Sequence, residues 1–171
     1  DSGAPTAHSS TSLPPAVRSP GAQPDGPPAR AAVLMVDDEP ALCRLSARAL
    51  AEYDTTTVTS AVAALELFAA VRRYDLVLCD VMLPQLGGLE LHARVRAIDP
   101  AQADRFVFIT GGSLTSTIGA ALQKLSQPVL LKPFSTTALV EQTRRWLGRW
   151  PIGFGAVMPL PRPSEEPPMP R

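Results

Sequence analysis

Three acidic side chains follow directly after a run of apolar residues near position 35. The sequence reads VLMVDDEP over residues 33–40, so that Asp37, Asp38 and Glu39 stand where the apolar segment ends. Like charges about 4 Å apart, at an effective dielectric constant near 20, repel by roughly 4 kcal/mol per pair. Either the pKa values of these carboxyl groups rise or a cation lies among them. Because the group offers oxygen ligands without His or Cys, we expect a hard ion such as Mg²⁺.

Three further polar side chains end apolar runs elsewhere in the chain. Asp80 follows LVLC, Thr110 follows FVFI, and Lys132 follows VLL. If these runs are parallel strands of one sheet, their carboxyl ends meet at one edge, where the functional crevice of such sheets lies. Singly, each residue could be a helix cap, a strand former or a surface charge. Together, four strand ends with complementary groups predict one site.

Two kinds of hydrophobic pattern alternate between residues 31 and 148 and would position these side chains. Apolar runs predict four buried strands and the more polar TTTVTS an edge strand, in the order AAVLMV, TTTVTS, DLVLCD, RFVFIT and PVLL. Between them, apolar residues recur at helical spacing in five segments, and we expect Leu45, Val62 and Ile98 in the buried stripes. Strands that alternate with helices predict a doubly wound α/β fold, with a five-stranded parallel sheet and five helices on its two faces.

Local signals indicate where the helices begin and end. Pro40 suits the first turn of the first helix, and Ser60 and Ser135 are candidate N-caps because their hydroxyls can accept a backbone N–H. Asp99 and Pro100 predict the end of the third helix, since the residue before a proline is disfavoured in the helical conformation.

The cysteines and histidines show no pattern of metal binding or catalysis. Cys43 and Cys79 fit no metal-ligand spacing and are expected to be small buried side chains in a reducing compartment, which favours a cytoplasmic location. His92 stands beside polar residues in the third helix and is expected at the surface, and His8 lies in the proline-rich lead.

Proline divides the chain into three parts. Most of the 19 prolines lie in residues 1–30 and 149–171, which we expect to be a disordered linker and a disordered tail around one domain at 31–148. The tail contains PLPRP, which could present a polyproline ligand. The first residue is Asp and not Met, which suggests that the chain was cut from a longer protein.

Charge and hydropathy exclude several classes of partner. The 16 basic and 16 acidic side chains balance, so a polyanion or an anionic membrane is not expected as the main partner. No apolar stretch approaches the roughly 20 residues that cross a bilayer, and the first residues have no signal-peptide pattern. No basic recognition helix is evident, so direct binding of nucleic acid is not expected.

Four motifs over residues 31–148 resemble the receiver domain of two-component response regulators. They are VLMVDDEP, LVLCDVMLPQLGGLEL, FVFITGG and VLLKPF, in the order and spacing of that family. The resemblance implies a flavodoxin-like fold, Mg²⁺ as cofactor, and a histidine kinase or histidine phosphotransfer protein as partner. It implies no enzyme in the ordinary sense, since a receiver catalyses only its own phosphorylation and dephosphorylation, although the parent chain could be a histidine kinase.

The resemblance assigns a role to each acidic residue of the predicted site. Asp80 resembles the phosphoacceptor. Asp38, Asp80 and the backbone carbonyl of Met82 resemble the direct ligands of Mg²⁺, and Asp37 resembles the acid that holds the ion through water.

Thr110 and Lys132 resemble the residues that contact the phosphoryl group. Thr110 matches the switch hydroxyl, and Lys132 matches the lysine that bonds the acyl phosphate. Residues expected to support the site are Glu39 at the start of the first helix, Pro84 and Gly88 of the loop after the acceptor, Gly111 beside the switch hydroxyl, and Pro133, which suits the unusual peptide geometry after that lysine.

Three positions depart from the common receiver pattern. Val129 stands where many receivers carry an aromatic residue, so coupling of the switch hydroxyl to a swinging ring is not expected. Met82 and Gly112 occupy the positions that influence the attack of water on the acyl phosphate, and neither can orient a water molecule. Slow self-dephosphorylation is therefore expected.

Several alternatives stay open at this point. The domain could be the C-terminal receiver of a hybrid histidine kinase, which TGG and Val129 favour, or a stand-alone receiver that acts through protein partners. A phosphohydrolase of the haloacid dehalogenase type needs a second acid where this chain has Met82. A receiver-like interaction module that is never phosphorylated usually lacks one of the acids or the lysine, and this chain has them all.

Overall fold

The computed structural model describes residues 30–70, 72–111 and 116–150, which form a single five-stranded sheet covered by helices. All strand pairs are parallel, and the strand order is β2-β1-β3-β4-β5. The strands are β1 (Ala32–Val36), β2 (Asp54–Val58), β3 (Leu76–Asp80), β4 (Phe106–Gly111) and β5 (Val129–Lys132). The helices are α1 (Pro40–Ala49), α2 (Ala61–Ala69), α3 (Gly88–Ile98), α4 (Pro100–Ala103), α5 (Ser116–Lys124) and α6 (Thr136–Leu147).

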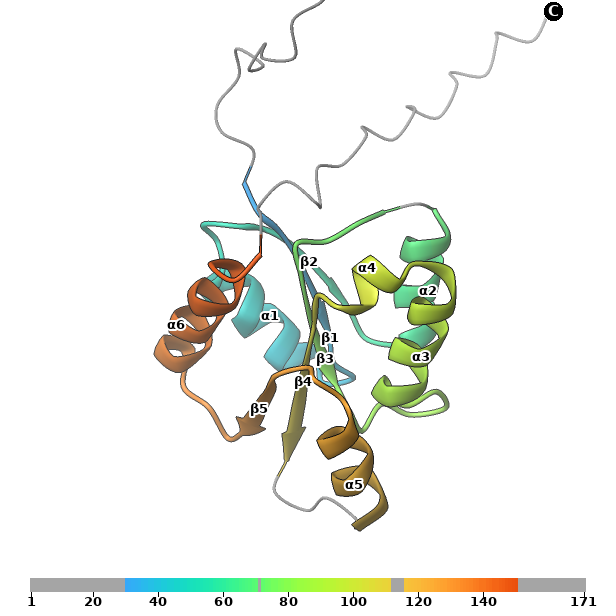
Figure 1. The fold of residues 1–171 in the computed structure, drawn as a ribbon. Helices are drawn as coiled ribbons and strands as arrows, with labels where there is room; N and C mark the ends of the chain where they lie inside the picture. Colours follow the sequence, from blue (N-terminus) through green and yellow to red (C-terminus); the bar gives the residue numbers. More distant parts are fainter. Residues whose placement is uncertain (1–29, 71, 112–115, 151–171) are drawn as a thin grey trace, which may run out of the picture.

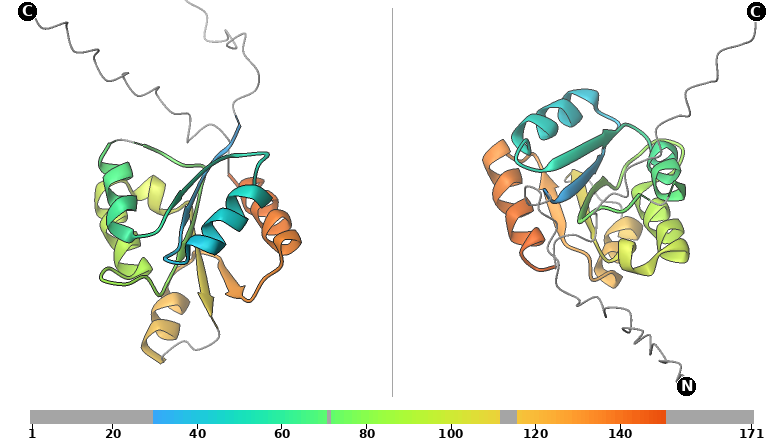
Figure 2. Two further views of the ribbon diagram at one scale, coloured as in Figure 1. Left: turned by 180° about the vertical axis from the view of Figure 1, so that it is seen from behind. Right: turned by 90° about the horizontal axis from the view of Figure 1, so that it is seen from above.

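The sheet separates two hydrophobic cores. Helices α1 and α6 cover one face, and α2 and α3 cover the other (Figures 1 and 2). Alternate residues of the central strands supply each core: Val33 and Met35 lie with α1 and α6, and Leu34 and Val36 lie with α2 and α3. β1 and β3 are buried along their whole length, as strands covered on both faces must be. The predicted doubly wound parallel fold is confirmed, and the more polar β2 lies at an edge of the sheet. The prediction of a buried strand at PVLL is wrong, because β5 lies at the other edge, with Val129 and Leu131 exposed at 39% and 61%.

The predicted helix starts are also confirmed. The hydroxyls of Ser60 and Ser135 each accept an N–H three residues later, from Ala63 and Ala138, at 3.1 Å. Pro40 occupies the first turn of α1. A serine at this position stabilises a helix by about 1 kcal/mol relative to alanine, because it satisfies an otherwise unpaired donor.

The sequence predicted five helices, and the structure adds a sixth, the single turn α4. The backbone N–H of Asp99 ends α3 by donating to Val95, and its carboxylate then caps α4 by accepting the N–H of Gln102 at 3.2 Å. The side chain of Gln102 makes two hydrogen bonds to the backbone of Tyr74. Its Oε1 accepts the N–H at 2.8 Å, and its Nε2 donates to the carbonyl at 3.1 Å. One turn carries no hydrophobic period, so the pattern could not reveal this helix.

Leu45, Val62 and Ile98 were predicted to be buried and are exposed, at 49%, 48% and 66%. In α1 the buried side chains are instead the small Cys43 and Ser46. These three residues therefore lie outside the faces that the helices bury against the sheet.

The prediction of a surface position for His92 is wrong. Its side chain is buried, its ring lies edge-on to Phe106 and Phe108, and its Nε2 donates to the carbonyl of Ala103 at 3.2 Å. Burial lowers the pKa of His92, and the charge of nearby Arg96 lowers it further. The two cysteines are buried and free, as predicted. Among the described helices, none has the length and apolar character needed to span a membrane.

The buried His92 makes stability depend on pH in a predictable direction. Because the pKa of His92 is lower in the folded chain than in the unfolded chain, the unfolded chain binds the proton more readily. The contribution of His92 to the free energy of unfolding should be greatest above pH about 6.5 and should fall as the pH decreases below it, by at most about 1.4 kcal/mol per pH unit for one proton. Urea unfolding at several pH values between 5 and 8 measures this.

Two variants isolate the contribution of this one side chain. His92→Gln removes the titrating group and should flatten the pH dependence between pH 7 and 5, although it also loses some stability. His8→Gln changes the other histidine of the chain and should leave the dependence as it is. An unchanged slope in His92→Gln would assign the effect to another group.

Candidate functional site

Three carboxylates gather at the carboxyl edge of the sheet. Asp37 follows β1 and Asp80 ends β3, and these strands are neighbours with Val36 paired to Cys79. One carboxylate oxygen from each of Asp37, Asp38 and Asp80 lies within 4.8 Å of the others. Asp37 is fully buried, whereas Asp38 is exposed. The cluster is therefore enclosed by the sheet on one side and open to solvent on the other.

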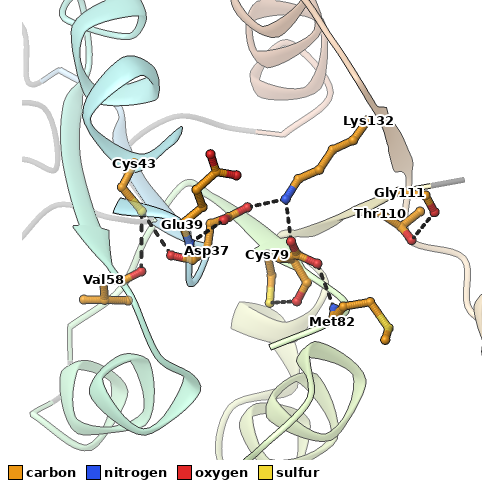
Figure 3. A network of polar contacts seen from close by, with 10 residues as sticks. Asp37, Glu39, Cys43, Val58, Cys79, Met82, Thr110, Gly111 and Lys132 are labelled. Atoms are coloured by element: carbon orange, nitrogen blue, oxygen red, sulfur yellow. Dashed lines mark hydrogen bonds and ion pairs between the residues drawn. The ribbon is translucent and has the colours of Figure 1, made fainter. Parts of the chain in front are cut away.

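Lys132 joins two of these carboxylates. Its Nζ lies 2.7 Å from Oδ2 of Asp37 and 2.5 Å from Oδ2 of Asp80 (Figure 3). Burial by itself would lower the pKa of Lys132, but the hydrogen bonds and charges of both carboxylates raise it overall. The ammonium group therefore remains charged. Burial raises the pKa of Asp37, and the bonds from Lys132 and from the N–H of Glu39 oppose that rise.

Backbone donors orient the remaining oxygens of the two bridged carboxylates. Oδ1 of Asp37 accepts the N–H of Glu39 at 2.9 Å, and Oδ1 of Asp80 accepts the N–H of Met82 at 2.7 Å. Both aspartates are thus held by the loop that follows their own strand. In the described part of the chain, the side chain of Asp38 makes no hydrogen bond or ion pair, so its oxygens are available to a ligand.

The donor set fits Mg²⁺. Three carboxylates carry three negative charges, Lys132 balances one of them, and the remainder suits a divalent cation. The predicted third direct ligand, the carbonyl of Met82, belongs to the loop directly after Asp80, and Met82 is 56% exposed. The site has the oxygen ligands and the solvent access that this ion requires, because Mg²⁺ retains several waters when bound.

Thr110 lies at the same edge, but its hydroxyl is turned away from the acids. The residue is fully buried at the end of β4, and Oγ1 donates to the carbonyl of Gly111 at 3.2 Å (Figure 3). A Cβ on Gly111 would meet nothing within 4 Å apart from its chain neighbours. Gly112, which was also singled out, lies outside the described residues.

Gly88 is required by a close approach between α3 and β3. A Cβ at this position would lie 2.1 Å from the carbonyl oxygen of Asp80 and 3.0 Å from Sγ of Cys79. The N–H of Gly88 donates to Val81 at 3.0 Å, which fixes the start of α3 against the end of the strand. The phosphoacceptor candidate is therefore positioned by a contact that tolerates no side chain.

The other supporting residues lie where the loops turn. Pro84 accepts the N–H of Leu86 at 2.8 Å, and Gln85 between them has a positive φ of 65°. The peptide bond between Lys132 and Pro133 is cis. Glu39 occupies the N-cap position of α1, and its side chain makes no capping hydrogen bond.

Cys43 has a role that the sequence did not indicate. Its thiol donates to the backbone carbonyl of Asp37 at 3.2 Å, with the carbonyl of Val58 at 3.8 Å (Figure 3). The N–H of Asp37 also donates to Val58, at 3.2 Å. These contacts hold the first acidic loop against β2. Burial raises the pKa of the Cys43 thiol, so it remains a neutral donor.

Substitution of Gly88 tests the close approach at the end of β3. Gly88→Ala places a methyl group against backbone atoms that cannot move freely, so it should lower the free energy of unfolding by about 1–3 kcal/mol, as overpacking usually does. Gly119 in α5 is the matched control, since a Cβ there meets nothing within 4 Å. Gly119→Ala should be neutral or stabilising by up to about 1 kcal/mol, because alanine is the better helix former.

Urea denaturation of both variants gives the comparison. Opposite signs are expected, with Gly88→Ala unfolding at lower urea concentration than the parent chain. Equal midpoints for the two variants would show that the loop after Asp80 can move to accept a side chain.

Comparison with known proteins shows likeness over most of the described domain. Residues 33–144 match the family model of the response regulator receiver domain. The probable transcriptional regulatory protein TcrX of Mycobacterium tuberculosis is 33% identical over 127 residues, which cover 73% of this chain and 52% of that protein. The response regulator ArlR of Staphylococcus saprophyticus is 32% identical over 121 residues, which cover 70% and 53%. The chain spans about half the length of the curated relatives it matches.

Solved structures show the same arrangement of strands and helices. NtrX from Brucella abortus is 28% identical with a TM-score of 0.61, over 70% of this chain and 27% of that chain. The chemotaxis protein CheY4 from Vibrio cholerae is 24% identical with a TM-score of 0.60, over 68% of this chain and 98% of that chain. The second likeness is one of fold alone.

Proposed function

Because this chain belongs to the response regulator receiver domain family of two-component systems, we propose that it accepts a phosphoryl group on Asp80 from a phosphohistidine. The donor would be a histidine kinase or a histidine phosphotransfer protein. The observation that carries the proposal is the cluster of Asp37, Asp38 and Asp80 around the ammonium group of Lys132. A nucleophilic carboxylate beside a fixed cation suits phosphoryl transfer, which depends on positioning and on charge neutralisation.

Asp80 is the nucleophile in this proposal. One of its carboxylate oxygens forms a bond to phosphorus, and the bond from phosphorus to the imidazole nitrogen of the donor breaks. The N–H of Met82 and the Nζ of Lys132 each contact one carboxylate oxygen of Asp80 and orient the group for attack. Lys132 then neutralises charge on the phosphoryl oxygens as the acyl phosphate forms.

Asp37, Asp38, Asp80 and the carbonyl of Met82 would hold Mg²⁺, which supplies further charge neutralisation for the phosphoryl oxygens when bound. Asp37 is buried and already bonded to Lys132, which supports contact through water rather than direct ligation. Asp38 is exposed and without a partner in the described residues, which supports direct ligation.

Thr110 is the proposed switch residue. An aspartyl phosphate adds charge and acceptor oxygens at the end of β3, beside β4. The hydroxyl of Thr110, which donates to its neighbour's carbonyl, would turn toward these oxygens and change the packing of β4 and α5.

For the parent protein we propose the C-terminal receiver of a hybrid histidine kinase, with a stand-alone receiver as the alternative. The aliphatic Val129 and the TGG motif support the first, whereas relatives named as transcriptional regulators and response regulators favour neither. The sequence of the parent gene upstream of Asp1 distinguishes the two. We propose a cytoplasmic location, which the two free buried cysteines support.

Phosphorylation should depend on Asp80. Incubation with acetyl phosphate and Mg²⁺ should add one phosphoryl group per chain, seen as a mass increase, and the label should be lost from Asp80→Asn. Asp54→Asn is the control, because Asp54 is exposed on the edge strand β2, away from the cluster. Equal labelling of Asp80→Asn would leave a receiver-like interaction module as the function.

The acyl phosphate should decay slowly. Met82 and Gly112 cannot position a water molecule for attack, so the half-life of the phosphorylated chain should be minutes or longer. Met82→Asn supplies a group that can hydrogen-bond to water and should shorten it. Mass spectrometry of samples quenched with acid at successive times measures the phosphorylated fraction. A half-life of seconds in the unaltered chain would reject the expectation.

Mg²⁺ should stabilise the folded chain through Asp38. At a concentration one hundred times the dissociation constant, a ligand of the folded state adds about 2.7 kcal/mol to the free energy of unfolding. Asp38→Asn should lose most of this gain. Without Mg²⁺ the same variant should be equally or slightly more stable, because it removes a like charge from the cluster. Thermal unfolding with EDTA and with Mg²⁺ tests both statements, with Asp54→Asn as the control.

A further inference from the structure

A cavity of about 310 Å³ lies between the ends of α2 and α3 and the start of α4. It is at the amino edge of the sheet, since Gln102 in its wall is bonded to Tyr74, which precedes β3. The phosphorylation site lies at the carboxyl edge. The two sites are therefore separate, although α3 extends from one to the other, beginning at Gly88 and ending at Ile98.

The inner surface of this cavity is apolar and fixed. Phe68 and Val95 belong to the hydrophobic core and are 8% and 1% exposed. Gln102 is also buried, and both polar atoms of its side chain are bonded to the backbone of Tyr74, so it offers no free group to a ligand. Ile98, 66% exposed, adds an uncovered aliphatic wall. Such surfaces bind a hydrocarbon group.

The charged groups of the lining leave one donor available. Both oxygens of Asp99 already have a partner, because one caps α4 and the other pairs with Arg73 at 2.9 Å. Arg72 is half-buried, and in the described part of the chain its guanidinium makes no hydrogen bond or ion pair. Two arginines and one aspartate give the lining a net charge of +1. A guanidinium is planar and binds carboxylates through two parallel hydrogen bonds.

We propose that this cavity binds a small carboxylate with an apolar body, the carboxylate on Arg72 and the body against Phe68 and Val95. The volume is at the lower end of the range of about 300–1,000 Å³ for ligand pockets, and a cavity of about 150 Å³ already holds benzene. An aromatic ring with a short acidic arm fits this size. Cationic ligands are disfavoured, because the lining has a net charge of +1 and its one carboxylate is paired with Arg73.

A matched series of ligands tests the charge requirement. 3-Phenylpropionate, 3-phenylpropanol and 3-phenylpropylamine share one body and differ in the charge of the end group. They are titrated into the full chain carrying Asp80→Asn, without Mg²⁺, and followed by ¹H–¹⁵N NMR. The acid should bind at least five-fold more tightly than the alcohol, and the amine should not bind. Shifts should centre on Arg73, Ile98 and Gln102.

Variants test the assignment of each group. Arg72→Gln should lower the affinity for the acid to that for the alcohol. Ala69→Phe, at an exposed position of the lining, should prevent binding of both the acid and the alcohol. Arg94→Gln is the control, because Arg94 lies on the outer side of α3 and pairs with Glu90. The NMR spectrum reports whether each variant is folded. Absence of saturable binding, equal affinity for acid and alcohol, or unchanged binding in Arg72→Gln would overturn the proposal.

This test does not depend on the proposed phosphorylation. The Asp80→Asn background and the absence of Mg²⁺ remove the phosphoacceptor, so a negative result concerns the cavity alone. Conversely, a failure of acetyl phosphate to label Asp80 would leave the ligand experiment unaffected.

Discussion

The repulsion between carboxylates at adjacent strand ends is the constraint on which the rest of the site depends. The parallel register of β1 and β3 brings Asp37 and Asp80 together, whatever the loops do. Two such charges in a partly buried setting would repel by several kcal/mol without a counter-charge. Lys132 supplies it from β5, across the end of β4. The exposed Asp38 then leaves an excess of negative charge, which a further cation would balance.

Small residues and backbone N–H groups, rather than large side chains, hold the acidic residues in place. Gly88 allows the start of α3 to contact the carbonyl of Asp80, and the thiol of Cys43 holds the loop that carries Asp37. Loop N–H groups occupy one oxygen of each bridged carboxylate. The acids are therefore oriented before any ligand arrives, which reduces the reorganisation that a charged site would otherwise need.

The sheet and the site edge could be predicted from the sequence, because the apolar runs form strands that each end in a distinctive residue. Hydropathy alone could not show that β1, β3 and β4 are buried whereas the equally apolar β5 is half-exposed. The capping roles of Ser60 and Ser135 were likewise predictable, since an N-cap side chain bonds to an N–H only three residues later. The sequence could not reveal α4, whose single turn has no period and whose stability comes from Gln102 and Tyr74. The burial of His92 and the exposure of Ile98 depend on which face of a helix meets the sheet, and tertiary packing determines that face. The direction of the Thr110 hydroxyl depends on the side-chain rotamer, which the sequence pattern does not specify.

The reach of Lys132 has a consequence for newly made chains. Its partners Asp37 and Asp80 lie 95 and 52 positions earlier in the sequence, so the charged cluster assembles only when the last strand has joined the sheet. A chain still lacking β5 holds these acidic residues without their ammonium partner. The same contact that balances the charges therefore links the assembly of the acidic cluster to the addition of β5 to the sheet.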